Sequence, residues 1–186
     1  QGCSFCVIDD KKYKKSEKHI LVDDVLICLQ ELASLHRTKL ACSVIAITGS
    51  NGKTTSKELI SNVLSKKYNI LSTEGNLNNH IGVPLTLLKL NKNHQFAVIE
   101  MGANHLKEIE LLCEIAKPNF GLITNIGKAH VEGFGSIDNI LKGKTELYRY
   151  LKKNNGTVFV NSDDKKLSKN ATGLNSISYG NGSVYA

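Results

Sequence analysis

The sequence contains little of several residue types, and each scarcity excludes a class of protein. Its 186 residues include two prolines against fifteen glycines, which excludes collagen-like and linker-like chains. No stretch approaches the roughly 18 uninterrupted apolar residues of a membrane helix. The first residues also lack a basic segment leading into an apolar one, as a secretory signal would have. We therefore expect a cytoplasmic protein without membrane insertion.

Arginine is scarce, although the chain is basic. Lys and Arg total 24 against 17 Asp and Glu, a net charge of +7, yet Arg37 and Arg149 are the only arginines. A positive surface suits nucleic acids or small anions such as nucleotides. Base-edge readout depends on arginine, and the lysine cluster at 11–18 holds no aromatic residue except Tyr13. We expect no nucleic-acid partner.

The five cysteines do not form a disulfide pattern. Their number is odd and their spacing irregular, so reduced thiols are expected. Cys3 and Cys6 form one C-x-x-C pair, but a structural zinc site needs a second ligand pair that no nearby histidine supplies. We expect no zinc site.

Apolar runs alternate with helical periodicity along most of the chain. Residues 44–47 form a short apolar run typical of a strand buried on both faces. A glycine-rich turn follows, and then a helix with Leu59, Ile60, Val63 and Leu64 on one side. The unit is therefore strand, loop, helix.

This unit repeats with variation, without a repeated sequence. The expected elements are a helix capped by Asp23 or Asp24, strands at 44–47, 69–72, 96–99, 120–124 and 157–160, and helices at 84–90, 106–116 and 137–151. Such alternation predicts an α/β fold, like that of P-loop NTPases, with a mostly parallel sheet and helices on both faces. Residues 1–20 and 176–186 lack clear boundaries, so we expect a chain cut from a longer protein.

The loop after the first buried strand has the composition of a phosphate-binding loop. It consists of Gly49, Ser50, Asn51, Gly52, Lys53, Thr54 and Thr55. Glycines let backbone N–H groups approach anionic oxygens, and a helix N-terminus adds its dipole. Lys53 can reach the β- and γ-phosphates, and Thr54 can ligate Mg²⁺. Ile47 stands where the longer P-loop pattern has glycine, so the match is to a shorter variant.

Other polar residues end neighbouring strands at the same edge of the expected sheet. Glu100 follows one strand, Thr124 and Asn125 end the next, and His130 lies in the loop beyond. In parallel α/β sheets, ligands collect at the carboxyl ends of the strands. A Mg²⁺ role for Glu100 and a ligand role for His130 follow from this shared edge, with surface or capping roles as the alternatives.

Lys144 lies on the inward side of its expected helix. It shares a face with Ile137, Ile140, Leu141 and Tyr148. A lysine there either extends to the rim or is desolvated. Desolvation lowers the pKa of an amine, and its neutral form can then act as a nucleophile, including toward CO₂.

Together these motifs resemble the Mur ligases, the ATP-dependent amide-forming enzymes of peptidoglycan synthesis. The segments that carry the resemblance are GSNGKTT at Gly49, GNLNNHIGVPLTLL from Gly75, EMGANHLKEI from Glu100 and TNIGKAHVEGFGS from Thr124. The related folylpolyglutamate synthetases would have Gly-Ser after the loop lysine. Within the family, the segments are most similar to the member that joins D-alanyl-D-alanine to UDP-N-acetylmuramoyl-tripeptide.

The resemblance implies roles for individual residues. Lys53 would bind the transferring phosphate, and Thr54 with Glu100 would hold one Mg²⁺. His130 would help to hold a second, together with Lys144 if this lysine is carbamylated. The resemblance also assigns Asn76 and Asn79 to a loop near substrate and metals. Lys107 departs from the family pattern, which has glycine there.

The resemblance also implies a domain arrangement and a reaction. Residues 1–42 would end an N-terminal domain for the UDP substrate and include a linker helix, and residues 43–186 would form part of the central ATP-binding domain. The C-terminal domain would be absent, so we expect no complete catalysis by this chain alone. ATP would phosphorylate the tripeptide carboxylate, and the amine of D-alanyl-D-alanine would attack the acyl phosphate.

Three alternatives stay open at this point. A P-loop switch or motor would use ATP or GTP without joining substrates, although Asn91-Lys92-Asn93-His94 lacks the aspartate that reads guanine. A small-molecule kinase would release a stable phosphorylated product. Another Mur-type ligase would add a different amine. The oligomeric state and the diamino acid of the tripeptide are left open as well.

Overall fold

The computed structural model describes residues 3–127 and 131–181, and its core is one parallel sheet. The six strands lie in the order β4-β5-β3-β6-β7-β8, and every pairing is parallel. The strands are β3 (Ser43–Thr48), β4 (Ile70–Ser72), β5 (Phe96–Glu100), β6 (Phe120–Ile123), β7 (Thr157–Asn161) and β8 (Asn175–Tyr179). The expected α/β fold is confirmed.

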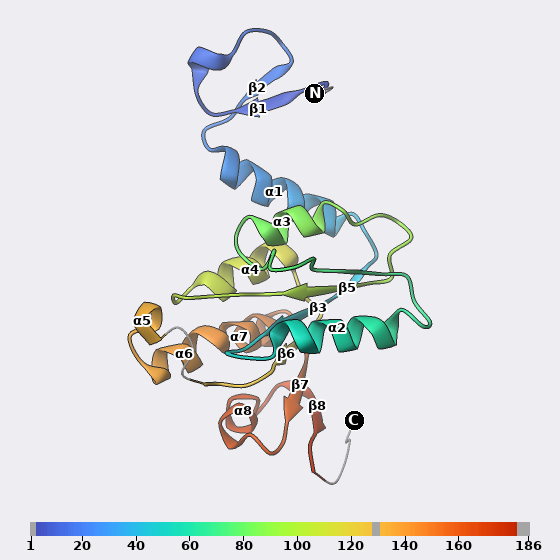
Figure 1. Ribbon diagram of the computed structural model, residues 1–186, viewed down its shortest axis with the longest axis vertical. Coiled ribbons are helices and arrows are strands. Elements are labelled where there is room, and N and C mark those ends of the chain that lie inside the picture. Colours follow the sequence, from blue (N-terminus) through green and yellow to red (C-terminus); the bar gives the residue numbers. More distant parts are fainter. Residues whose placement is uncertain (1–2, 128–130, 182–186) are drawn as a thin grey trace.

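Eight helices accompany the strands within the part of the chain that the structure describes. They are α1 (Val25–Thr38), α2 (Lys53–Leu64), α3 (Gly82–Leu87), α4 (Glu108–Ala116), α5 (Val131–Phe134), α6 (Ile137–Lys144), α7 (Glu146–Lys153) and α8 (Lys165–Asn170). A separate two-stranded parallel sheet, β1 (Cys6–Ile8) with β2 (His19–Leu21), and the short 3-10 helix Lys11–Tyr13 precede them. Figure 1 shows this small sheet at one end of the molecule and β7 and β8 at the other.

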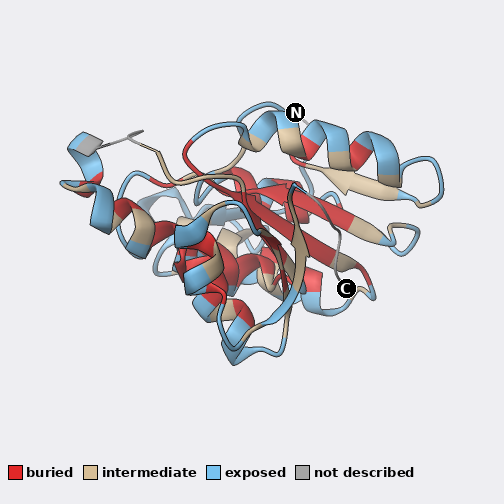
Figure 2. Ribbon diagram, turned by 90° about the horizontal axis from the view of Figure 1, so that it is seen from below, coloured by how far each residue is buried: buried red, intermediate tan, exposed pale blue. Residues whose placement is uncertain are grey.

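The two faces of the sheet are covered unequally. Alternate residues of β3, including Val44 and Ala46, face the larger core, which contains side chains of α1, α3, α4 and α7. Ile45 and Ile47 face the opposite way and pack with Ile60 of α2 in a smaller cluster. Burial of alternate strand positions on both faces explains the continuous apolar run of this strand. Figure 2 shows the central strands buried and the outer sides of the helices exposed.

The connections place a topological switch point beside β3. After β3 the chain passes through α2 to β4, which lies two positions away in the sheet. The strands next to β3 are β5 on one side and β6 on the other. The helices that follow β4, β5 and β6 lie on the face opposite α2. In such sheets, the crevice at the carboxyl ends of the strands near the switch point is where ligands bind.

Two expectations about the helices are wrong in part. The single helix expected at 137–151 is two helices that meet at Thr145, which has ψ 0° and whose hydroxyl joins its N–H in donating to the carbonyl oxygen of Leu141, at 2.8 Å and 2.9 Å. On α2, Leu59 and Val63 are 63% and 72% exposed, because this helix turns a different side to the sheet. Helix α8 and strand β8 were not expected at all.

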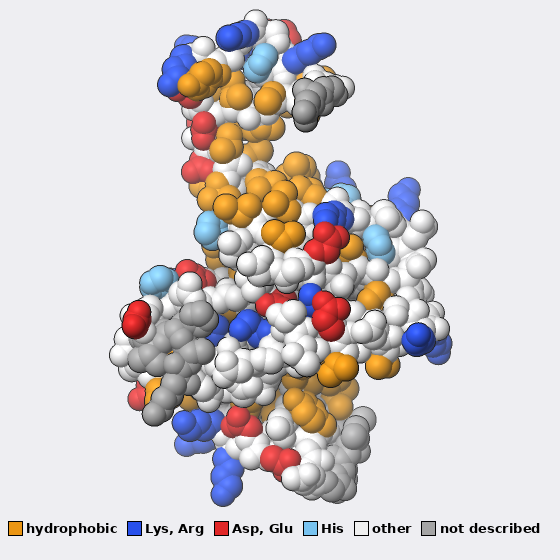
Figure 3. Space-filling model, in the orientation of Figure 1, with side chains coloured by type: hydrophobic (Ala, Val, Ile, Leu, Met, Phe, Trp, Pro, Cys, Tyr) orange, Lys and Arg blue, Asp and Glu red, His pale blue; other side chains and the backbone are white. Residues whose placement is uncertain are grey.

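Part of the apolar surface stays on the outside. Figure 3 shows hydrophobic side chains gathered over α1 and α3, where Ile27, Leu35 and Leu85 are between 41% and 54% exposed. Among the described residues, no helix is long and apolar enough to cross a membrane.

Candidate nucleotide-binding site

The loop between β3 and α2 has a backbone that requires its two glycines. Gly49 has φ +143°, and a Cβ there would lie 2.0 Å from Oγ1 of Thr124. Gly52 has φ +75°, in the left-handed region, and immediately precedes α2. Side chains at either position would strain or displace the loop. The sequence therefore folds into a tight turn that delivers the chain to a helix N-terminus.

The N-terminus of α2 is open to an anion. The first residues of a helix have no intrahelical partner for their N–H groups, and Gly52 supplies no side-chain cap. The N–H groups of Lys53, Thr54 and Thr55 therefore point out of the first turn with the positive end of the helix dipole. This arrangement fits the predicted phosphate site.

The preceding residues, Ser50 and Asn51, bind to the loop after β6. The N–H of Ser50 donates to the carbonyl oxygen of Asn125 at 3.0 Å, and the N–H of Asn51 donates to Oδ1 of Asn125 at 3.1 Å. The Ser50 hydroxyl donates to the carbonyl oxygen of Gly127 at 3.1 Å. Thr124 and Asn125 also donate to the carbonyl oxygen of Asn51. The loop after β6 thus fixes the shape of the glycine-rich loop, and direct phosphate contacts of Ser50 and Asn51 stay a prediction.

The Lys53 side chain folds over its own loop. Its Nζ donates to the carbonyl oxygens of Gly49 at 3.0 Å and Ser50 at 3.3 Å. The amino group is therefore already close to the loop that the sequence predicts as the phosphate cradle.

Thr54 and Glu100 meet as the sequence predicts. The Thr54 hydroxyl donates to Oε2 of Glu100 at 2.9 Å, and Nδ2 of Asn78 donates to Oε1 at 2.7 Å. Glu100 is 2% exposed. Hydroxyl and carboxylate oxygens are donors that suit Mg²⁺, so the two residues fit the predicted metal site.

The asparagine-rich loop after β4 brings a further residue, Asn78, to the site, and the substrate roles expected for Asn76 and Asn79 stay predictions. Asn79 caps the start of α3, with Oδ1 accepting from the N–H of Gly82 at 2.8 Å, and Asn76 is exposed. Asn78 instead contacts Glu100, and its carbonyl oxygen accepts from the N–H of Gly102. Sequence reasoning missed Asn78. The adjacent asparagines in the motif were the available signal, but spacing alone does not tell which amide turns inward.

Lys144 is buried, as its inward position predicts. It is 1% exposed, its Nζ donates to the carbonyl oxygen of Ala103 at 3.1 Å, and it lies 5.5 Å from the ring centroid of Phe134. Burial, together with the nearby charge of Lys53, lowers the pKa of Lys144 from 10.5 to about 8. A substantial neutral fraction therefore exists at mildly alkaline pH, as nucleophilic addition to CO₂ requires.

Glu146, two residues further on, holds the loop that follows β5. Glu146 is 5% exposed, and its carboxylate accepts hydrogen bonds from the N–H groups of Lys107 at 2.7 Å and Glu110 at 2.9 Å. These two bonds cap the start of α4. Lys107 has φ +70°, a left-handed conformation that favours glycine. The local turn is thus present despite the lysine at this position.

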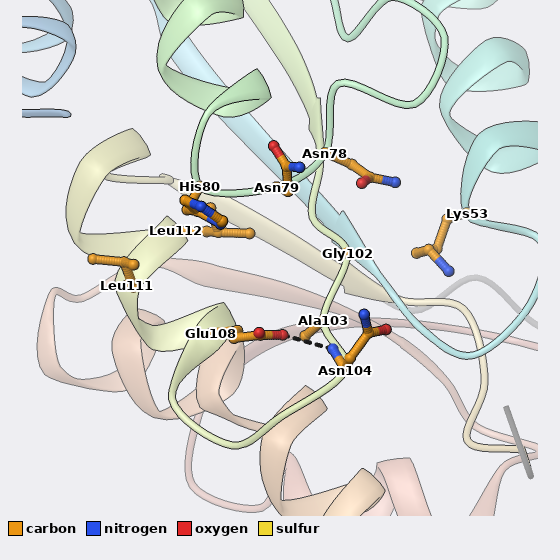
Figure 4. Close-up of a pocket in the computed structure, with 10 residues that line it drawn as sticks. All are labelled: Lys53, Asn78, Asn79, His80, Gly102, Ala103, Asn104, Glu108, Leu111 and Leu112. Carbon is orange, nitrogen blue, oxygen red and sulfur yellow. Dashed lines mark hydrogen bonds between the residues drawn. The ribbon is translucent and has the colours of Figure 1, made fainter. Parts of the chain in front are cut away.

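These elements surround one cavity of about 500 Å³ (Figure 4). It extends from Lys53 past the loop after β5 to α4. The lining residues are Lys53, Asn78, Asn79, His80, Gly102, Ala103, Asn104, Glu108, Leu111 and Leu112. In Figure 4, Lys53 and Asn78 line one part of the cavity, and Asn104 and Glu108 line another. A substrate next to the phosphate loop would have room here.

At the far end of the cavity, Glu108 is held in its ionised form. Burial alone would raise its pKa, but donation from the N–H groups of Asn104 and His105 and from the His105 ring brings the pKa below the ordinary value. The cavity therefore places a cation at one end and a carboxylate at the other.

His130 lies outside the described residues, so its expected metal role is untested. Within residues 3–127 and 131–181, no group of three or more His, Cys, Asp or Glu side chains is arranged to hold a metal. The site as described combines a phosphate loop, one hydroxyl–carboxylate pair and a buried lysine.

Comparison with known proteins agrees with this geometry. The Mur ligase middle domain matches residues 47–185. UDP-N-acetylmuramoyl-tripeptide--D-alanyl-D-alanine ligase of Haemophilus influenzae is 41% identical over 192 residues, covering 100% of this chain and 42% of that protein. The Bacillus subtilis protein of the same name is 43% identical over 163 residues, covering 88% of this chain and 35% of its own length.

Solved structures give the same result. The crystal structure of MurF ligase from Thermotoga maritima in complex with ADP has a TM-score of 0.89 and 32% identity, covering 98% of this chain and 43% of that one. This chain therefore spans about two fifths of the length of its relatives. The matching fold, the family match over most of the chain and the phosphate-loop geometry show that the chain belongs to the Mur ligase family, through its middle domain.

Proposed function

We propose that this chain is the nucleotide-binding part of an ATP-dependent ligase that joins D-alanyl-D-alanine to UDP-N-acetylmuramoyl-tripeptide. The observation that carries the proposal is the cavity that continues from Lys53, beside the open helix N-terminus and the Thr54–Glu100 pair. A phosphoryl donor and an acceptor carboxylate could meet there. The relatives that carry this activity in their names, at 41% and 43% identity, support the choice of substrates.

The proposed reaction uses the residues at the phosphate end as follows. The N–H groups at the start of α2 and the Lys53 amino group bind the β- and γ-phosphates. The γ-phosphoryl group passes from ATP to the tripeptide carboxylate, breaking the bond to the β-phosphate oxygen and forming an acyl phosphate. Thr54 and Glu100 would hold Mg²⁺, whose charge offsets that of the phosphoryl oxygens.

The second half of the reaction needs an amine and a leaving phosphate. The amino group of D-alanyl-D-alanine attacks the acyl carbon and loses a proton, and phosphate leaves, so that amide, ADP and phosphate result. In the proposal, the neutral amine of Lys144 adds to CO₂ and releases a proton to give a carbamate. With His130, this carbamate would supply oxygen and nitrogen donors for a second Mg²⁺.

The proposal includes the remaining parts of the protein. Residues 1–42 would end the domain that holds the UDP group and include α1 as a linker helix, and residues 43–186 would form part of the ATP-binding domain. Asn76 and Asn79 would contact the substrate from their loop. The enzyme would act in the cytoplasm, where ATP is available.

ADP release by the full-length protein tests this function. We expect release from Mg-ATP to require both UDP-N-acetylmuramoyl-tripeptide and D-alanyl-D-alanine, and to be abolished by Lys53→Ala. Lys67 is exposed, and the variant Lys67→Ala serves as a control for lost positive charge. Release that is indifferent to both substrates would favour a switch or motor, and a stable phosphorylated product without the amine would favour a kinase.

A further inference from the structure

A second buried lysine, Lys57, lies one helical turn beyond Lys53 and has no part in the reaction proposed above. Its side chain is 1% exposed, although α2 is otherwise a surface helix. Burying an amino group is costly unless its donors find acceptors. The acceptors that Lys57 has found therefore indicate what its position secures.

Lys57 joins α2 to the end of β4. Its Nζ donates to the carbonyl oxygen of Thr73 at 2.6 Å and lies 2.8 Å from Oε1 of Glu58. Glu58 is 58% exposed at its side chain, so the ion pair reaches the rim while the bond to Thr73 is internal. The internal contact is the one that links two elements of the site.

Thr73 also contacts the backbone of Glu100, the residue whose carboxylate would hold Mg²⁺ in the proposed function. Thr73 is 1% exposed, and its hydroxyl accepts the N–H of Glu100 at 2.9 Å. Thr73 thus accepts a hydrogen bond from Lys57 at its carbonyl oxygen and one from the N–H of Glu100 at its hydroxyl. The phosphate-binding helix and the strand end that carries Glu100 are connected through two hydrogen bonds.

The same threonine starts the asparagine-rich loop. Five residues later, Asn78 returns to Glu100 and donates to Oε1. The Glu100 residue is therefore held at its backbone by Thr73 and at its carboxylate by Asn78 and Thr54. Loss of the bond from Lys57 would leave Thr73 tied to β5 by its N–H, which donates to the carbonyl oxygen of Val98 at 3.0 Å, but would remove the bond that fixes Thr73 to α2.

We infer that Lys57 is a positioning residue that sets Glu100 against Thr54, and thereby determines how strongly the site gains nucleotide affinity from Mg²⁺. The inference rests on the proposed function only in taking ADP and ATP as ligands of the loop. Among the described residues, Nζ of Lys57 contacts Thr73 and Glu58 and not the carbonyl oxygens of the phosphate loop, and Lys57 does not line the cavity. Its effect should therefore appear in the metal dependence and not in the binding of the nucleotide alone.

Calorimetric titration of ADP into the full-length protein tests this, once with Mg²⁺ and once with EDTA. For Lys57→Met we expect the Mg²⁺-dependent gain in affinity to fall about 10-fold, as for other losses of support behind a metal ligand. The affinity in EDTA should be unchanged. A lysine that only stabilises the fold would lower both affinities together, or lower the melting temperature and change neither.

Matched variants separate the internal bond from the ion pair. Glu58→Gln removes the carboxylate partner but leaves the Thr73 bond, and should keep the wild-type gain from Mg²⁺. Lys66→Met, an exposed lysine just beyond α2, controls for lost charge. An effect of Glu58→Gln equal to that of Lys57→Met would overturn the route through Thr73.

Thr73→Val keeps the test decisive if Lys57→Met fails to fold. It preserves the carbonyl oxygen that Lys57 contacts and removes the hydroxyl that holds Glu100. We expect the same loss of Mg²⁺-dependent affinity, and an unchanged gain from Mg²⁺ would contradict the inference. If wild-type protein binds Mg-ADP but joins no substrates, the proposed function fails while this inference stands or falls on the titrations alone.

Discussion

The two sides of the nucleotide site each bury one lysine, and the two are held differently. On the α2 side, Lys57 has a carbonyl oxygen at 2.6 Å and a carboxylate oxygen at 2.8 Å. On the α6 side, Lys144 has one carbonyl oxygen at 3.1 Å and an aromatic ring nearby. Both side chains are 1% exposed.

The difference agrees with the proposed roles, in which Lys57 supports the site and Lys144 reacts with CO₂. A carboxylate partner satisfies the charge of Lys57 and fixes the end of β4. Within the described residues Lys144 forms no ion pair with a carboxylate, and its pKa of about 8 gives a larger neutral fraction near physiological pH than an ordinary lysine has. Equal burial therefore does not imply equal chemistry, because the two amino groups have different partners.

The largest effect should come from removing the reactive lysine. Lys144→Met in the full-length enzyme should lower kcat about 100-fold, since the site loses the proposed carbamate ligand in a charge-crowded region. Steady-state ADP release measures this, with the exposed lysine of Lys142→Met as control. Added bicarbonate should not restore the rate. Wild-type turnover in Lys144→Met would show that Lys144 only packs in the core and has no catalytic role that Lys57 lacks.

The pH dependence of stability should sharpen the comparison. The folded pKa of Lys144, about 8, lies below the ordinary 10.5, so between these values the unfolded state binds more protons. Lys144 therefore lowers the free energy of unfolding by its full amount below pH 8. This destabilisation decreases as the pH rises toward 10.5.

Replacing Lys144 should remove that dependence. We expect Lys144→Met to unfold with a free energy about 2 kcal/mol higher at pH 7, the pKa shift less one lost hydrogen bond. Denaturant titrations at several pH values measure the difference, which should shrink as the pH approaches 10. A difference that stays constant over this range would show that titration of Lys144 is not its source.

The smallest effect should come from the left-handed residue on the α6 side. Lys107 has φ +70° and donates its N–H to Glu146. Lys107→Gly should raise stability by about 0.5 kcal/mol, because glycine relieves the backbone strain at some cost in unfolded-state entropy. Thermal melting measures it. Lys107→Ala keeps the Cβ and should give no gain, so equal gains from both variants would assign the effect to the lysine side chain instead.

The parts of the site that sequence reasoning could reach are those set by local backbone chemistry. The glycines at 49 and 52, the lysine that follows and the acidic residue at the end of β5 each have a meaning fixed by their place between strand and helix. Lys144 was also predictable, since one helical period linked it to Ile140 and Tyr148. The α/β alternation gave the fold class for the same reason.

The rest depends on contacts between distant segments. The orientation of α2 decides that Leu59 is exposed and Lys57 buried, so the apolar spacing was right for Ile60 and Leu64 and wrong for Leu59 and Val63. The position of Lys57, three before Ile60 and seven before Leu64, was the available signal. Which asparagine reaches Glu100 is set by the path of a loop, and the boundary between α6 and α7 lies at Thr145, whose hydroxyl bonds back to Leu141.

The contacts of Lys53 with its own loop have a consequence for ligand choice. An incoming group must draw the amino group away from the carbonyl oxygens of Gly49 and Ser50, which are neutral acceptors. A phosphate can do so because its negative charge attracts the lysine cation more strongly than the dipole of a carbonyl group does. A nucleoside, which carries no phosphate, offers no such exchange. We therefore expect this loop to bind ligands that carry phosphate in preference to nucleosides.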